Sequence, residues 1–340
     1  MATRQQSTTQ GSWLPATCLT LALAGCGIQE DSQTDGSADP PFTIRNVTGN
    51  LYEARTASHN AVFLATTDGI IVVDPLRADF AEWLEGELAA RFDSEVEYVI
   101  YSHHHPDHVA GGQVFADTAI FIGHENTAAR LEGGLLPSNA ALSDTDGNGL
   151  LARSEASGGY LAGFDSMDTD GDGNLSGSEI NAGTHPLDVT YTEQLMLTLG
   201  DSTVELHHPS AAHSNDTTVV LFPNERAAFT VDFLHARRFP GTLSGYTVAE
   251  YEAALATVDA LDFDILVPGH GNAGTKPDVR AFLGLLRDLE ADVMAGIAEG
   301  LDRETLQETI LLADYSDWLL YDQRRANIVG EMYDTLSASE

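Results

Sequence analysis

Four metal-binding side chains lie within six residues of the chain, and this cluster constrains the fold and the chemistry more than any other feature. They are His103, His105, Asp107 and His108. The apolar run 96–101 in front of them predicts a buried β-strand, so the cluster lies where a strand ends and a loop begins, a usual place for functional side chains. Imidazole and carboxylate are the ligands that zinc favours after thiolate. Because packed core histidines are rarely clustered in this way, the motif predicts a metal site.

The amino-acid composition excludes several classes of function. The 340 residues carry 52 acidic and 16 basic side chains, a net charge of −36, and Lys276 is the only lysine. Such a surface repels nucleic acid, so we expect no nucleic-acid partner. We interpret the charge as a solvated acidic coat, as in proteins from salty water, in preference to a surface for a specific cationic partner. Cys18 and Cys26 are the only cysteines, which excludes a disulfide framework, a cysteine nucleophile and a thiolate zinc site in the rest of the chain.

The N-terminus has the features of a targeting segment. Arg4 precedes the apolar stretch 13–24, which is too short to span a bilayer, and Gly25 and Cys26 follow it. The run Leu-Ala-Gly-Cys at 23–26 resembles a bacterial lipobox, in which the cysteine becomes the lipidated first residue; a plain signal peptide cut nearby is the alternative. We therefore expect a lipoprotein signal peptide at 1–25, lipidation of Cys26 and a flexible polar tether at 26–41. These features predict a protein of the bacterial cell envelope, anchored to the membrane by lipid and facing the periplasm or the exterior.

The pattern from residue 42 onward predicts alternating strands and helices. We expect strands at 44–47, 51–54, 61–66, 70–73, 96–101 and 119–122, with helices at 80–92 and 125–132. After an interruption, strands are expected at 195–199, 203–207, 218–222, 228–231 and 265–267, a helix at 246–258, and a mostly helical segment at 279–336. This alternation indicates an α/β layered domain formed by 42–132 and 186–340.

The interrupting segment, 133–185, contains two acidic loops that fit the calcium-binding loop of EF-hands. Each loop has twelve residues, 144–155 and 168–179, with oxygen ligands at positions one, three and five, a backbone carbonyl at seven, a glycine at six and a glutamate at twelve. The predicted calcium ligands are Asp144, Asp146, Asn148, Leu150 and Glu155 in the first loop, and Asp168, Asp170, Asp172, Asn174, Ser176 and Glu179 in the second. The alternative is an acidic loop that binds nothing.

The spacing of the two loops indicates a compact arrangement. A repeat of 24 residues (168 − 144) leaves little room for two helices between the loops. The segment resembles the loop-helix repeats of dockerins more than a sensor EF-hand pair. Because calcium is abundant outside the cytoplasm, we expect a structural calcium clamp in preference to a switch. The alternative function of this insertion is to dock a protein partner.

Three later residues complete the first motif. His213 follows the strand 203–207, Asp232 ends the strand 228–231, and His270 follows the strand 265–267. With this set the chain resembles the metallo-β-lactamase superfamily over 42–274 apart from the insertion. The resemblance implies a four-layer αβ/βα sandwich, extended here by the EF-hand-like insertion and by C-terminal helices.

The resemblance also implies a role for each motif residue. It makes His103, His105 and His213 ligands of one zinc ion, Asp107, His108 and His270 ligands of a second, and Asp232 the carboxylate that bridges both. Asp74, at the end of the strand 70–73, matches an aspartate that supports the ligands from outside; a turn-capping aspartate is the alternative. Two residues depart from the family pattern, since Val231 and Ala212 stand where glycine is usual before Asp232 and His213. These departures change backbone freedom and leave the ligands intact.

The implied reaction is hydrolysis of a small-molecule substrate. Two zinc ions share a hydroxide that attacks a carbonyl, and Asp107 orients it and passes a proton to the leaving group. We expect the bond to be an ester, lactone, thioester or amide, with a β-lactam ranked below a lactone or ester. One alternative is a mononuclear-iron enzyme resembling persulfide dioxygenases, which needs only part of the ligand set. The other is a calcium-dependent envelope interaction protein with a vestigial metal site.

Several polar and aromatic residues remain without an assigned role. His235, Arg237 and Arg238 follow the bridging aspartate and either line the pocket or serve surface and packing roles. Lys276 follows His270 and could meet a substrate carboxylate, while His104 is expected to face away from the metals. The C-terminal aromatic residues Trp318, Tyr321 and Tyr333 either cap the site or belong to the core.

Overall fold

The structure is a computed structural model, and it describes residues 42–56, 58–132 and 134–338. The predicted signal peptide, the lipidation site Cys26 and the tether lie outside these residues. Within the described residues, no helix combines the length and the apolar character that crossing a bilayer requires.

The first sheet, in the described part of the chain, has seven strands in the order β1-β2-β3-β4-β5-β6-β9. They are β1 (Thr43–Thr48), β2 (Leu51–Arg55), β3 (Asn60–Thr66), β4 (Gly69–Val73), β5 (Val96–Ile100), β6 (Ile120–His124) and β9 (Val189–Tyr191). Strands β1 to β4 form an antiparallel meander, whereas β4, β5, β6 and β9 run parallel. A hairpin turn at Asp68-Gly69 joins β3 and β4, and Gly69 takes a φ of 144° there.

The second sheet has the order β10-β11-β12-β13-β14-β15 among the described residues. Its strands are β10 (Gln194–Leu199), β11 (Ser202–His207), β12 (Val219–Phe222), β13 (Ala227–Val231), β14 (Ile265–Pro268) and β15 (Gly274–Thr275). Only β13 and β14 are a parallel pair. All strands expected from the sequence are confirmed, with ends that differ by one or two residues.

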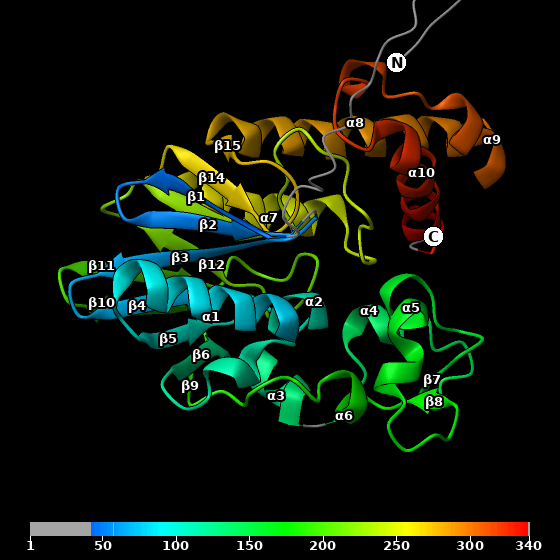
Figure 1. The fold of residues 1–340 in the computed structure, drawn as a ribbon. Helices are drawn as coiled ribbons and strands as arrows, with labels where there is room; N and C mark the ends of the chain where they lie inside the picture. Colours follow the sequence, from blue (N-terminus) through cyan, green and yellow to red (C-terminus); the bar gives the residue numbers. More distant parts are fainter. Residues whose placement is uncertain (1–41, 57, 133, 339–340) are drawn as a thin grey trace, which may run out of the picture. The chain divides into compact units, whose positions relative to one another are not determined.

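The two sheets pack face to face, and helices cover their outer faces (Figure 1). The inner core joins Leu64 and Ile71 of the first sheet to Val204, Val220 and Phe229 of the second. Helix α1 (Ala78–Phe92) covers the first sheet, because its predicted apolar face buries Phe80, Leu84 and Leu88. Helices α7 (Val248–Ala260), α8 (Pro277–Ala298) and α10 (Tyr321–Ser337) cover the second. The predicted four-layer sandwich is confirmed.

The C-terminal helices belong to the outer core of the second sheet. Helix α9 (Arg303–Thr309) precedes a 3-10 turn, η2 (Ala313–Tyr315), and α10. Trp318 is buried in this core, and the ring of Tyr321 packs edge-on against Phe239 at 5.4 Å. Core packing therefore accounts for these aromatic residues.

One helix boundary differs from the prediction for a clear physical reason. The helix expected at 246–258 begins only at Val248, because Thr247 forms a capping box with Glu250. The Thr247 hydroxyl accepts from the Glu250 amide, and the Glu250 carboxylate accepts from the Thr247 amide, which satisfies two otherwise free donors. The Thr-x-x-Glu pattern at 247–250 is the sequence signature of such a capping box.

The segment 134–185 has a small core of its own. It contains α4 (Ser138–Ala141), β7 (Leu151–Ala152), α5 (Gly158–Met167), β8 (Asn174–Leu175) and α6 (Gly177–Ile180). Leu151, Phe164 and Leu175 are fully buried in this core, and Leu151 pairs with Leu175 in the β7–β8 ladder. A single helix, α5, lies between the two acidic loops, as the 24-residue spacing predicts.

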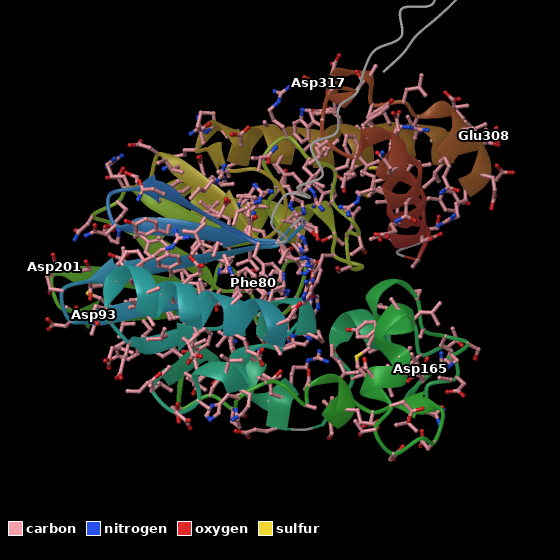
Figure 2. The ribbon with its side chains drawn as sticks, viewed as in Figure 1. Phe80, Asp93, Asp165, Asp201, Glu308 and Asp317 are labelled. Atoms are coloured by element: carbon pink, nitrogen blue, oxygen red, sulfur yellow. The ribbon has the colours of Figure 1, made fainter. Side chains whose placement is uncertain are left out.

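Many acidic side chains lie on the surface, whereas Glu53, Asp74, Asp216 and Asp232 are buried. Figure 2 shows Asp93, Asp165, Asp201, Glu308 and Asp317 pointing outward from different elements. Phe80, by contrast, is fully buried beneath α1. This distribution is that of a solvated coat spread over several elements.

Candidate metal centre

The structure brings the seven predicted metal ligands together in two groups. Within each group, the donor atoms lie within 4.8 Å of one another. The first group is His103, His105 and His213, and the second group is Asp107, His108, Asp232 and His270. Residues that are up to 167 positions apart (270 − 103) therefore share one site.

Strand ends position these side chains. The His103 cluster follows β5, Asp232 follows β13, and His270 follows β14 by one residue, Gly269. The short helix α2 (Pro106–Val109) turns Asp107 and His108 toward the site, and the 3-10 turn η1 (Gly112–Phe115) comes after it. Buried Asn60 of β3 donates from its side-chain amide to Pro268 and Gly271 carbonyls at 2.8 Å each. The first sheet therefore holds the loop that carries His270.

One carboxylate oxygen faces both groups. The Oδ2 atom of Asp232 lies 3.0 Å from His270 Nε2, 3.2 Å from His108 Nε2 and 3.8 Å from His213 Nε2. His213 belongs to the first group and the other two histidines to the second. Asp232 thus has the position that a ligand shared by two ions requires.

Asp74 fixes the orientation of one histidine from each group. Its carboxylate accepts from His108 Nδ1 at 2.7 Å and from the Ser102 hydroxyl at 2.6 Å. The Ser102 oxygen in turn accepts from His103 Nδ1 at 3.0 Å. With each Nδ1 donating to these partners, both Nε2 atoms face the site as the positions open to a metal ion. Asp74 therefore holds His108 directly and His103 through Ser102, and it makes more contacts than a turn cap alone requires.

Burial and charge set the protonation of the two groups differently. Burial lowers the pKa of His103 and His105 well below the usual histidine value, and neighbouring imidazoles lower it further. Both are neutral near pH 7, the form that binds a metal. Burial raises the pKa of Asp232, but His270 and His108 outweigh this and hold it well below its usual range. The second group therefore combines the ionised carboxylate of Asp232 with two imidazoles, His108 and His270, whose positive charge lowers the pKa of that carboxylate.

The donor set fits divalent metal ions. His103 Nε2 and Asp232 Oδ1 are buried and have no hydrogen-bond partner, although an unsatisfied buried polar atom is costly. Both atoms belong to the groups described above, so a cation bound there would satisfy them. Nitrogen and carboxylate donors without thiolate suit zinc and related divalent ions.

Comparison with known proteins identifies the family. The sequence profile described as "Metallo-beta-lactamase superfamily" matches residues 54–270, which include all seven of these side chains. The chain belongs to the metallo-beta-lactamase superfamily. This is a family of metal-dependent hydrolases, and the resemblance seen in the sequence is confirmed at that level.

Solved structures of the superfamily share the fold. A metallo-beta-lactamase from Pontibacter korlensis superposes with a TM-score of 0.51 at 16% identity, over 72% of this chain and 99% of that chain. The DIM-1 metallo-beta-lactamase gives 0.53 at 17% identity, over 73% of this chain and 98% of the other. No curated protein sequence matches the chain significantly. At these identities the likeness concerns the fold alone.

The two departures from the superfamily pattern have different consequences for the backbone. Val231 takes a φ of 57°, a left-handed conformation that a β-branched residue adopts only under strain and that glycine adopts freely. Ala212 is fully buried, and the positive φ falls instead on His213, at 67°. Strain is therefore stored directly beside Asp232 and at His213.

His59 is a site residue that the sequence reasoning missed. Its Nε2 atom donates to Asp107 Oδ2 at 3.2 Å, and its ring lies 4.4 Å from that of His270. The residue lies between β2 and β3, 48 positions before Asp107. A lone histidine in a hairpin turn carries no motif, so only the folded structure assigns it to the site.

His104 does face away from the metal groups. It is buried, and both its amide and its Nδ1 atom donate to Asp216 at 2.9 Å. The Thr127 hydroxyl donates to the same carboxylate oxygen at 2.8 Å. Asp216 therefore joins the loop of His213 to the histidine motif and to α3 (Glu125–Glu132), a role with no sequence signal.

A cavity of about 180 Å³ opens onto the metal groups. His235 and Arg238 line this cavity, which is one of the two roles that the sequence left open for them. Arg324 of α10 lines it as well. Arg237 instead points away and pairs with exposed Asp317. Lys276 does not line this cavity, because its ammonium group donates to the Leu261 carbonyl and lies over the ring of Phe263.

The two acidic loops of the insertion have matching local geometry. The carboxylate of Asp144 accepts from the Gly147 and Gly149 amides, and that of Asp168 accepts from the equivalent Gly171 and Gly173 amides. One group of close donor atoms combines Asp144, Asp146 and Glu155, and the other combines Asp168, Asp170 and Glu179. The predicted ligands at positions one, three and twelve are thus brought together in both loops.

Proposed function

We propose that the protein is a binuclear zinc hydrolase of the bacterial cell envelope that cleaves an ester, lactone, thioester or amide bond. The observation that carries the proposal is the position of Asp232, whose carboxylate faces donors of both metal groups. A mononuclear-iron enzyme of the persulfide dioxygenase type has less support, because the donors Asp107, His108 and His270 would then have no metal to bind. We expect the bond that is cut in the natural substrate to be a lactone or an ester in preference to a β-lactam.

The residues of the site have separate roles in the proposed hydrolysis. Two bound zinc ions supply Lewis acidity and an activated water near neutral pH. Asp107 is half-buried at the cavity, where its carboxylate can orient the attacking water, accept a proton from it and pass that proton to the leaving group. His59 holds that carboxylate through its 3.2 Å hydrogen bond to Oδ2.

The decisive experiment is hydrolysis of a small panel by the zinc-loaded protein. The panel contains a chromogenic cephalosporin, an aryl ester, an acyl lactone and a glutathione thioester. We expect turnover of at least one member, and a loss of about 100-fold in kcat for Asp107→Ala, the usual size of an acid-base contribution. Exposed Asp117→Ala is the matched control and should retain activity. No turnover of any member with both zincs bound would contradict cleavage of these bonds.

We also propose that the insertion binds two calcium ions as a structural clamp. The twelve-residue spacing, the glycine at position six and the gathered carboxylates support it. Removing calcium should lower the thermal midpoint of the wild-type protein by several degrees, since a ligand that binds only the native state stabilises it. Glu155→Gln and Glu179→Gln should each weaken calcium binding in calorimetry.

The control for the clamp is Asp165→Asn, which lies in the same insertion but outside both loops. It should bind calcium as the wild type does. A midpoint that does not respond to calcium in the wild type, together with no heat of binding, would leave the loops as unliganded acidic turns.

A further inference from the structure

The turn between β2 and β3 meets the second metal group from the first sheet. His59 in this turn forms an isolated antiparallel bridge with His270, and the Asn60 amide donates to the Gly269 carbonyl at 2.8 Å. His270 Nδ1 donates to the Ser58 carbonyl at 2.9 Å, while its Nε2 atom lies in the metal group. The turn therefore orients one ligand of the second group.

The side chain of His59 reaches another ligand of the same group. Its Nε2 atom lies 3.2 Å from Asp107 Oδ2, closer than His270 Nε2 at 3.5 Å or His108 Nε2 at 3.7 Å. Burial raises the pKa of Asp107, but His108 and two hydrogen bonds outweigh burial and hold that pKa well below its usual range. An ionised carboxylate only accepts hydrogen bonds, so the neutral His59 ring carries its proton on Nε2. Its Nδ1 atom then accepts from the Ser58 hydroxyl at 2.8 Å.

Local contacts hold His59 in this orientation. Thr56 Oγ1 accepts from the His59 amide at 3.0 Å and from the Ser58 amide at 3.2 Å, and the Thr56 amide donates to the His59 carbonyl at 2.9 Å. The imidazole is only 25% exposed, and its centroid lies 4.4 Å from that of His270. Because the turn already orders the ring, little conformational freedom is lost when it donates to Asp107.

The two metal groups have different supports. In the first group, His103 Nδ1 donates to Ser102, which donates to Asp74. The contacts of the β2–β3 turn described above end on Asp107 and His270, and both belong to the second group. A defect in this turn should therefore affect the second group and leave the first intact.

We propose that His59 is a positioning residue that sets the affinity of the second metal ion by fixing the Asp107 carboxylate. A hydrogen bond to one side of a ligating carboxylate orients the lone pairs that remain for the metal. His59 does not line the cavity in the described part of the chain, so it acts through Asp107 and not on the substrate. This inference rests on the proposed binuclear hydrolase and adds the residue that keeps its second site filled.

The test counts metal ions, so it needs no known substrate. Metal-free protein is titrated with zinc in competition with a chromophoric chelator, which gives the two stepwise affinities. His59→Phe keeps a ring beside His270 and loses the donor. We expect it to bind the second ion about 10- to 100-fold more weakly than the wild type, the usual cost of losing an outer hydrogen-bond partner of a ligand. The first ion should bind as in the wild type, and the absorption of added cobalt(II) should show the same two steps.

Three further variants identify the hydrogen bond as the cause. His59→Gln offers an amide N–H in the place of Nε2 and should recover most of the affinity for the second ion. His59→Ala, which removes the ring as well, should weaken the second ion at least as much as His59→Phe. His207→Phe makes the same change at a partly buried histidine outside both groups and should bind both ions as the wild type does.

The outcomes separate the inference from the function on which it rests. Equal affinity for the second ion in the wild type and His59→Phe overturns the inference and leaves the binuclear hydrolase intact. An equal loss of affinity for both ions also overturns it, and so does a His59→Gln protein that binds the second ion no better than His59→Phe. A wild-type protein that binds a single ion overturns the proposed binuclear function, and the role of His59 falls with it.

Discussion

Replacement of His103 by alanine is expected to empty the first metal group and to lower turnover by about 1,000-fold or more. Its Nε2 atom is fully buried, has no hydrogen-bond partner among the described residues and is one of the three nitrogen donors of the first group, so the variant loses a third of that donor set. A metal that polarises a substrate contributes several kcal/mol to the transition state, and each 1.36 kcal/mol is about tenfold in rate. Zinc content per protein chain and kcat/KM on the best panel substrate are the two measurements.

The matched control for this variant is His207→Ala in β11. His207 is partly buried and its ring pairs with Glu205 at 3.1 Å, outside both metal groups. It should retain full zinc content and turnover. A His103→Ala protein that kept two zinc ions and normal kcat/KM would show that the first group is not the catalytic metal site.

The strands and the metal motif could be predicted from sequence because both are encoded locally. The predicted strands 70–73 and 96–101 are long enough to be recognised, and each is followed by a polar residue that supports the site, Asp74 and Ser102. The four predicted ligands from His103 to His108 lie within six consecutive residues. Their relation to His213, Asp232 and His270 came from the motif contexts, since spacing alone does not bring residues so far apart together.

The supporting contacts could not be predicted, because they join distant segments without a motif. His59 reaches Asp107 across 48 positions, and Asp216 reaches His104 across 112. Arg324 enters the cavity from a helix that follows the metal motifs, and nothing in its neighbours distinguishes it from other surface arginines. Lys276 was close to His270 in sequence, yet β15 lies between them and directs it to the Leu261 carbonyl.

Asp216→Ala is expected to destabilise the protein by about 3 kcal/mol or more, because each buried donor left without a partner costs about 1–3 kcal/mol. The carboxylate is fully buried and accepts from the His104 amide, the His104 ring and the Thr127 hydroxyl. Alanine would leave all three donors without a partner in the interior. Chemical denaturation of the metal-loaded protein, followed by tryptophan fluorescence, measures the change in the free energy of unfolding.

Two further variants determine what Asp216 contributes. Asp216→Asn keeps an acceptor oxygen and loses the negative charge, so it should cost clearly less than Asp216→Ala if the hydrogen bonds to this side chain stabilise the fold. Asp292→Ala removes an exposed carboxylate from α8 and should change stability by no more than about 0.5 kcal/mol. If Asp216→Ala were as stable as Asp292→Ala, the His104–Asp216 pair would not hold the loop of His213. His103 of the first metal group would then keep the support of Ser102 and Asp74.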